Sequence, residues 1–99
     1  MTTPVIFRKF RKGGDVIALF PTLVADMNPA LCQSYMHVGQ HGAAAPGKEL
    51  VPAAPEEYAN LLAELRRIGY DDLKIVRRFT QAHFRAREAA ITNMRSATQ

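Results

Sequence analysis

The sequence predicts an α+β domain in which a three- to four-stranded antiparallel sheet packs against one amphipathic helix, with a second helix at the C-terminal end. Two β-rich runs flank a glycine pair near the N-terminus, an apolar stripe with helical spacing lies mid-chain, and alanines concentrate late in the chain. The 99 residues suffice for one domain, expected over residues 1–95, with a frayed tail at residues 96–99.

The first two strands are expected at residues 5–10 and 16–20. Gly13 and Gly14 lie between them, and glycine adopts positive φ without steric cost, so a hairpin is predicted. Alternation in the first strand gives each face both apolar and basic side chains, which is typical of a half-covered sheet. Pro21 lacks a backbone N–H and is expected to end the second strand or to mark an edge.

A turn is predicted at residues 26–29, because an asparagine that precedes proline avoids the helical region. Residues 31–38 are expected to form the third strand of the sheet. Residues 39–47 are rich in glycine and alanine and predict a loop, whereas residues 50–51 are a candidate short strand.

A helix is specified most fully over residues 55–68. Pro55 suits the first helical position, acidic residues fill the first turn, and arginines fill the last turn, as the helix dipole favours. Ala54 is a poor N-cap, and Gly69 is expected at the C′ position. The apolar stripe consists of Tyr58, Leu61, Leu62, Leu65 and Ile68.

Residues 73–79 alternate in polarity and predict a fourth strand, with a helix as the alternative. The alanine content of residues 80–94 favours a second helix. We expect this helix to cover an edge of the sheet or to extend a basic face.

Positive charge concentrates at the two ends of a chain whose formal net charge is +4. If the first and last elements are neighbours, they build one basic face that attracts polyanions; the alternative is that the charge serves solubility. Four aromatic residues offer stacking faces or, as we favour, core packing: Phe7, Phe10, Tyr35 and Phe79. The candidate polyanion-binding residues are Arg8, Lys9, Arg11, Lys12, Arg77, Arg78, Arg85 and Arg87.

Residues 34–42 hold two of the three histidines and two glycines, an unusual composition for a connector. We interpret this stretch as either a tightly turning strand end or a small site. The candidate functional block within it comprises Tyr35, His37, Gly39, Gln40, His41 and Gly42.

A metal or catalytic site at Cys32, His37 and His41 is the least favoured use of that block. The two histidines share a metal only if the backbone reverses between them, and a fourth ligand is missing. On a strand, His37 faces away from Cys32, so no nucleophilic dyad is ready-made. We therefore expect no catalytic residue, no metal and no cofactor, with Cys32 a buried apolar residue.

A lone cysteine favours a reducing compartment, and no secretory signal is apparent at the N-terminus. No apolar run approaches the length that crosses a bilayer. We expect a cytoplasmic protein without a membrane partner.

Residues 34–42, together with residues 5–10, 15–21 and 55–70, resemble a family of small uncharacterised bacterial proteins carried on plasmids, prophages and other mobile elements. The resemblance spans about residues 5–80, and the departures lie in the alanine-rich residues 43–46 and in the C-terminal tail. It implies a genomic setting and no activity.

The leading functional hypothesis is a non-enzymatic basic binding module that contacts a polyanion, such as nucleic acid, or an acidic protein surface. A regulatory protein that contacts a host factor through an apolar patch is the alternative, and the site at Cys32, His37 and His41 is the third. The oligomeric state stays open.

Overall fold

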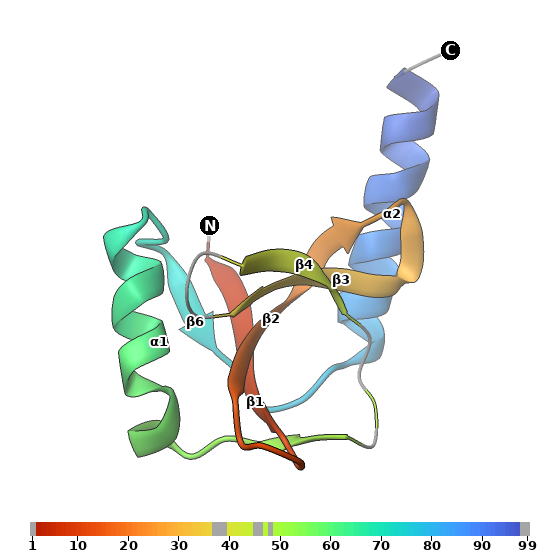
Figure 1. Ribbon diagram of the computed structural model, residues 1–99. Coiled ribbons are helices and arrows are strands. Elements are labelled where there is room, and N and C mark those ends of the chain that lie inside the picture. The colour runs from red at the N-terminus through yellow and green to blue at the C-terminus, as the bar shows by residue number, and fades with distance from the viewer. Residues whose placement is uncertain (1, 37–39, 45–46, 48, 98–99) are drawn as a thin grey trace.

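Figure 1 shows the computed structural model, which describes residues 2–36, 40–44, 47 and 49–97. Along the chain its elements are β1 (Thr3–Phe10), β2 (Val16–Ala25), β3 (Asn28–Met36), β4 (Gln40–Ala44), β5 (Leu50–Pro52), α1 (Pro55–Arg67), β6 (Leu73–Ile75) and α2 (Gln81–Ala97). The predicted α+β class is confirmed, but in this part of the chain the sheet has six strands instead of three or four.

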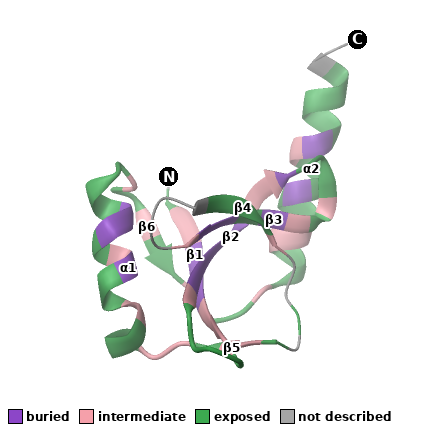
Figure 2. Cartoon of the chain, in the orientation of Figure 1, coloured by how far each residue is buried: buried purple, intermediate pink, exposed green. Residues whose placement is uncertain are grey.

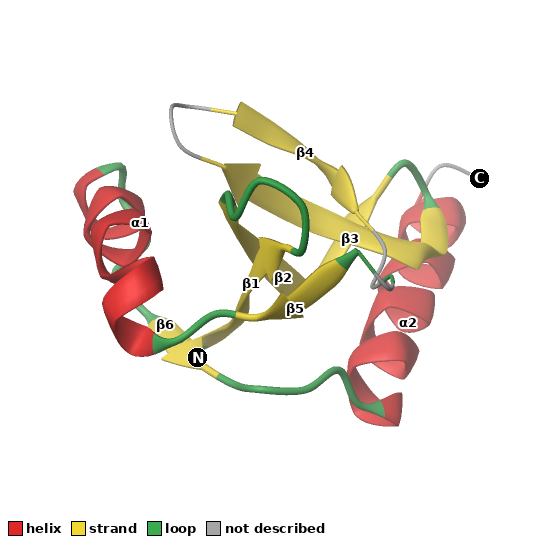
Figure 3. Ribbon diagram, turned by 60° about the horizontal axis from the view of Figure 1, so that its bottom comes forward, coloured by secondary structure: helices red, strands yellow, loops and turns green. Residues whose placement is uncertain are grey.

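The sheet has the strand order β4-β3-β2-β1-β5, and all neighbours along this path are antiparallel. The outer edge of β1 is shared by two short strands. β6 runs parallel to residues 3–5 of β1, whereas β5 runs antiparallel to residues 8–10. Figure 3 shows these two strands at separate positions along β1.

The predicted end of the second strand at Pro21 is wrong, because β2 continues to Ala25 and lies inside the sheet between β1 and β3. The pairing of β2 with β3 shifts register between Phe20 and Val24. A residue without an N–H is tolerated at such an irregularity, since no regular ladder bond depends on it there.

The turn predicted at residues 26–29 is confirmed, although it is tighter than expected. Asp26 and Met27 have φ values of 55° and 54°, which are the left-handed values of a two-residue type I′ hairpin turn. Asn28 already pairs with Ala25, and its side-chain oxygen accepts a hydrogen bond of 2.9 Å from the Ala30 N–H.

The loop predicted over residues 39–47 contains a strand, and this prediction is also corrected. β4 pairs antiparallel with β3 along its whole length. An edge strand needs backbone hydrogen bonds on one side only, so glycine and alanine suffice even though they show no apolar alternation. The candidate strand at residues 50–51 is confirmed as β5, and the third strand is described as far as Met36.

Each face of the sheet carries a buried core, contrary to the half-covered sheet that the first strand indicates. α1 covers one face, where Leu61 and Leu65 pack in a core with Val5, Phe7, Ala18, Phe20 and Tyr35. The opposite face has its own core of Ile6, Ile17, Leu19 and Cys32, against which Val76 and Phe79 pack. Figure 2 shows buried residues concentrated along β1 and β2 between the helices.

The ends of α1 agree with the sequence prediction. Ala54 provides no capping oxygen, but its N–H donates to Glu57 Oε1 at 2.9 Å, which satisfies one of the exposed donors. At the other end Gly69 has a φ of 119°, and the Tyr70 N–H donates to the Leu65 carbonyl at 3.1 Å in a Schellman arrangement.

The predicted strand at residues 73–79 is confirmed only as far as Ile75, and β6 runs parallel to β1. The segment after it crosses the second core and leads into α2, which packs against β2 and β3. α2 extends past the predicted end at residue 94 into the expected tail, to Ala97. Neither helix in the described part of the chain combines the length and apolar character that spanning a membrane requires.

α2 begins with a reciprocal cap. The His83 N–H donates to Thr80 Oγ1 at 3.2 Å, and the Thr80 N–H donates to His83 Nδ1 at 3.1 Å. This is the geometry of a capping box with histidine in the place of glutamate. Burial and the positive charge of Arg87 hold the pKa of His83 below its ordinary value.

We expect the free energy of unfolding to decrease as the pH falls, because protonation of His83 disrupts this cap. The neutral imidazole accepts the bond from Thr80, so the folded state resists protonation and the unfolded state, with a pKa of about 6.5, takes the proton first. The contribution of the cap to the free energy of unfolding should therefore be complete above about pH 6.5. It should decline as the pH falls through the pKa that His83 has in the folded state. Urea unfolding at a series of pH values measures this decline.

The matched control is His83→Gln, whose amide oxygen can accept the same hydrogen bond but does not titrate. Its unfolding free energy should decline less between neutral and mildly acidic pH, since the other histidines are common to both proteins. An identical decline in the two proteins would show that the cap does not titrate.

Candidate functional site

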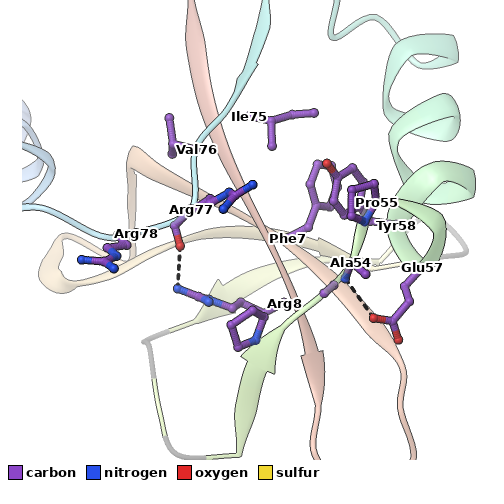
Figure 4. Close-up of a pocket in the computed structure, with 12 residues that line it drawn as sticks. Phe7, Arg8, Ala54, Pro55, Glu57, Tyr58, Ile75, Val76, Arg77 and Arg78 are labelled. Carbon is purple, nitrogen blue, oxygen red and sulfur yellow. Dashed lines mark hydrogen bonds between the residues drawn. The ribbon is translucent and has the colours of Figure 1, made fainter.

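A hollow lies where β5 and β6 separate along the outer edge of β1. Its volume is about 590 Å³. We call it the arginine groove, and residues 7–8, 52–55, 57–58 and 75–78 line it. Figure 4 shows these side chains around the opening.

The groove results directly from the sharing of the β1 edge. The Val76 N–H donates to the Val5 carbonyl at 2.9 Å, and the Ala53 N–H donates to the Phe7 carbonyl at 3.3 Å. After these two bonds the chains diverge, one from β5 into α1 and the other from β6 towards α2. The space between them is therefore bounded by two segments and backed by β1.

Three arginines lie along one side of the groove. Arg8 projects from β1, and its Nη2 donates to the Arg77 carbonyl at 2.9 Å, which fixes its guanidinium next to the segment that follows β6. Arg77 and Arg78 are exposed. Among the described residues, no acidic side chain forms an ion pair with any of the three.

The one carboxylate that lines the groove is compensated. Glu57 Oε2 lies 2.5 Å from Lys9 Nζ, and its other oxygen accepts the Ala54 N–H. The hydrogen bond from Lys9 and the bond from the Ala54 amide hold the pKa of Glu57 below its ordinary value. The groove therefore keeps a positive balance at neutral pH.

The other side of the groove is apolar. Tyr58 of α1 stacks on Phe7, with ring centroids 4.2 Å apart and planes 9° from parallel. Pro55 lies next to Tyr58, and Ile75 is 42% exposed although it belongs to a strand. The groove thus combines three guanidinium groups with a wall of rings and aliphatic carbon.

The structure divides the predicted polyanion-binding residues. Arg8, Arg77 and Arg78 come together in the groove, with Lys9 beside them through Glu57. The other predicted residues lie elsewhere: Arg11 and Lys12 at the exposed β1–β2 turn, and Arg85 on the exposed side of α2. The basic segments near the two ends of the chain therefore meet only at β1 and the segment after β6. The predicted residues do not form one continuous basic face.

Arg87 is a correction to the prediction. It is 5% exposed, and its guanidinium donates to the carbonyls of Pro29 at 2.8 Å and Pro21 at 2.5 Å. It also lies 5.6 Å from the ring centroid of Phe84. Its charge stabilises the contact between α2 and the β2–β3 hairpin and is not presented to a polyanion.

The block at residues 34–42 contributes to the α1 face of the sheet. Tyr35 is 2% exposed and its hydroxyl donates to the buried Glu64 carboxylate. His41 lies opposite Tyr35 on β4, with ring centroids 4.7 Å apart in an edge-on arrangement. Gln40 and Gly42 belong to β4, whereas His37 and Gly39 lie outside the described residues.

Cys32 and His41 lie on opposite faces of the sheet, because Cys32 is three residues from Tyr35 on β3 and packs in the second core. They cannot bind one metal in this arrangement. Cys32 is 1% exposed, and burial raises the pKa of its thiol, so a reactive thiolate is disfavoured. Among the residues described, no three His, Cys, Asp or Glu side chains are grouped to hold a metal ion.

Three residues that matter here were not singled out for function from the sequence. In the sequence, Tyr58 fits the apolar stripe of α1, Ile75 fits an alternating strand, and Glu64 fits a polar position of the helix. Only Glu64 carried a usable signal, since it falls next to Leu65 on the side of α1 that faces the sheet.

No family model, curated protein or solved structure matches this chain. The resemblance to proteins of mobile elements stays a prediction.

Proposed function

We propose that the protein is a non-enzymatic binding module that holds a polyanion at the arginine groove. The observation that supports this most strongly is the convergence of Arg8, Arg77 and Arg78 on one concave surface, from segments 69 residues apart in the sequence. Guanidinium groups match phosphate and carboxylate oxygens in pairs, and positive charge in a concave site draws anions from solution.

Arg8 supports the proposal in a second way. Its hydrogen bond to the Arg77 carbonyl uses one of its five N–H donors and holds the side chain across the groove. A guanidinium that is already fixed loses less conformational freedom when it binds an anion. The groove is therefore partly organised before any ligand arrives.

The binding test is a titration of the protein with labelled mixed DNA and RNA at about 50 mM salt and above, followed by fluorescence anisotropy. We expect binding whose affinity falls steeply with salt. The double variant Arg77→Gln/Arg78→Gln should bind about tenfold more weakly and should reduce the salt slope by about 1.5, because two phosphate contacts are removed.

The matched control is Arg67→Gln/Arg85→Gln, which removes the same charge from exposed positions outside the groove. This control should bind nearly as tightly as the unaltered protein. The absence of binding at low salt would refute the proposal. Equal losses in the two double variants would show that overall charge, and not the groove, attracts the ligand.

The proposal includes the setting that the sequence predicts, namely a cytoplasmic protein of a mobile element. The alternative is a regulatory protein that contacts a host factor, and the specific observation in its favour is the exposed Ile75 within the groove. A complex with a host protein that tolerates high salt would favour this alternative.

A further inference from the structure

The arginine groove has two unlike sides that face the same space. Arg77 and Arg78 lie on one side, and Tyr58 with Pro55 lies on the other (Figure 4). Ile75 adds a large exposed aliphatic side chain to the lining. A ligand that fills the groove therefore presents negative charge and a flat apolar surface within a short distance of each other.

Resting on the function proposed above, we propose that the polyanion is single-stranded nucleic acid, with a phosphate on the arginines and a nucleobase against Tyr58, Pro55 and Ile75. A nucleotide unit carries both required features, the phosphate and the base, on one sugar. The volume of about 590 Å³ lies in the range of small-molecule sites and accommodates one nucleotide with its neighbouring phosphate.

Duplex nucleic acid satisfies only half of this site. Its bases are stacked on one another inside the helix, and its backbone presents phosphates alone to a protein surface. A single strand can turn a base outward against a ring, and such contacts tolerate any sequence because every base has a flat face. The apolar side of the groove therefore contributes affinity for single strands only.

An acidic peptide fits the arginines but fits the apolar side less well. Its carboxylates occupy the same guanidinium groups, while its side chains offer no flat ring next to each charge. The ring of Tyr58 is planar and suits a planar base, and the Pro55 ring adds apolar surface beside it. For this reason the observations favour nucleic acid over a protein ligand, and the peptide becomes an outcome of the test.

The test compares four labelled probes of similar length at low salt: oligothymidylate, the same strand without bases, a DNA duplex, and polyglutamate. We expect oligothymidylate to bind about tenfold tighter than the abasic strand, and tighter than the duplex and polyglutamate. Equal affinity for oligothymidylate and the abasic strand, or a preference for the duplex or for polyglutamate, would overturn the inference while the groove still binds a polyanion. If none of the four binds, the proposed function itself fails.

Ile75→Ser tests the apolar side by itself, because a side chain that is 42% exposed contributes little to the core. We expect several-fold weaker binding of oligothymidylate and unchanged binding of the abasic strand. Ile68→Ser is the matched control, because Ile68 is 49% exposed at the end of α1 and outside the groove. Unchanged oligothymidylate affinity in Ile75→Ser, or equal loss for both strands, would contradict a base at this wall.

Tyr58→Leu removes the ring but keeps an apolar side chain. It should weaken oligothymidylate binding more than Tyr58→Phe does, again without an effect on the abasic strand. Because Tyr58 stacks on Phe7, the circular dichroism of both variants is recorded alongside the titrations. A folded Tyr58→Leu protein that binds both strands as before would overturn the role of this ring.

Discussion

Substituting either Leu19 or Phe20 with alanine is expected to destabilise the protein by about 3 kcal/mol, although the two side chains are adjacent in sequence. Leu19 is 0% exposed in the core beneath Val76 and Phe79, and Phe20 is 1% exposed in the core beneath α1. Adjacent residues on a strand point to opposite faces, so the two substitutions probe the two cores separately.

The size of both effects follows from cavity formation. Each alanine leaves a void that the surrounding side chains fill only in part, and Phe20 also loses a stack on Tyr70 with centroids 5.0 Å apart. Urea unfolding measures the two free energies. Ile68→Ala is the control, with an expected change below about 0.5 kcal/mol at a position that is 49% exposed.

A sheet with one covered face gives a different pattern. One of the two substitutions would then cost several kcal/mol and the other almost nothing, because its side chain would be removed from a solvated surface. That result would restore the half-covered sheet that the first strand of the sequence indicates and would contradict the second core.

The elements that were predictable from the sequence are those specified by neighbouring residues. α1 carries its own stripe, its proline at the start and its glycine at the end, so both its face and its bounds follow from about 15 positions. The β1–β2 hairpin was likewise predictable, because Gly13 and Gly14 lie between two β-rich runs and both adopt positive φ.

The elements that were missed depend on residues far away in the chain. β4 consists mainly of small residues and exists as a strand because β3 offers it a backbone edge. Pro21 remains within β2 because the register shift next to it removes the need for its N–H. No local sequence pattern indicates the edge that β3 offers or the register shift in β2. Residue propensities therefore predict a loop in place of β4 and a strand end at Pro21.

Some residues of the groove were predictable from the sequence, but the place where they meet was not. Arg8, Arg77 and Arg78 were identified as basic candidates, but their meeting depends on the way in which β5 and β6 divide one edge of β1. The apolar side, built by Tyr58 and Ile75, was hidden because both residues fit ordinary core or strand positions. A binding surface of this kind emerges from topology and not from a motif.

Arg87 shows where the sequence held more information than charge alone. It falls between Phe84 and Ile91 at helical spacing, on the side of α2 that faces the sheet. A basic residue within an apolar stripe predicts a buried partner for its charge. The carbonyls of Pro21 and Pro29 are these partners, from the two strands of one hairpin.

Arg87→Met is accordingly expected to destabilise the protein by about 2–3 kcal/mol and to loosen α2 from the β2–β3 hairpin. The substitution keeps much of the side-chain volume but removes both donors, so two carbonyls in the interface lose charge-assisted hydrogen bonds. Burial of the guanidinium itself costs free energy, and the substitution removes that cost. The expected destabilisation is therefore smaller than the full cost of leaving two buried carbonyls without donors.

Urea unfolding and amide hydrogen exchange measure the two parts of this expectation, since loosened packing exposes the amides of α2 before global unfolding. Arg85→Met, on the exposed side of the same helix, should change the unfolding free energy by less than about 0.5 kcal/mol. If Arg87→Met were as stable as Arg85→Met and its α2 amides were equally protected, the guanidinium would not hold the helix to the hairpin.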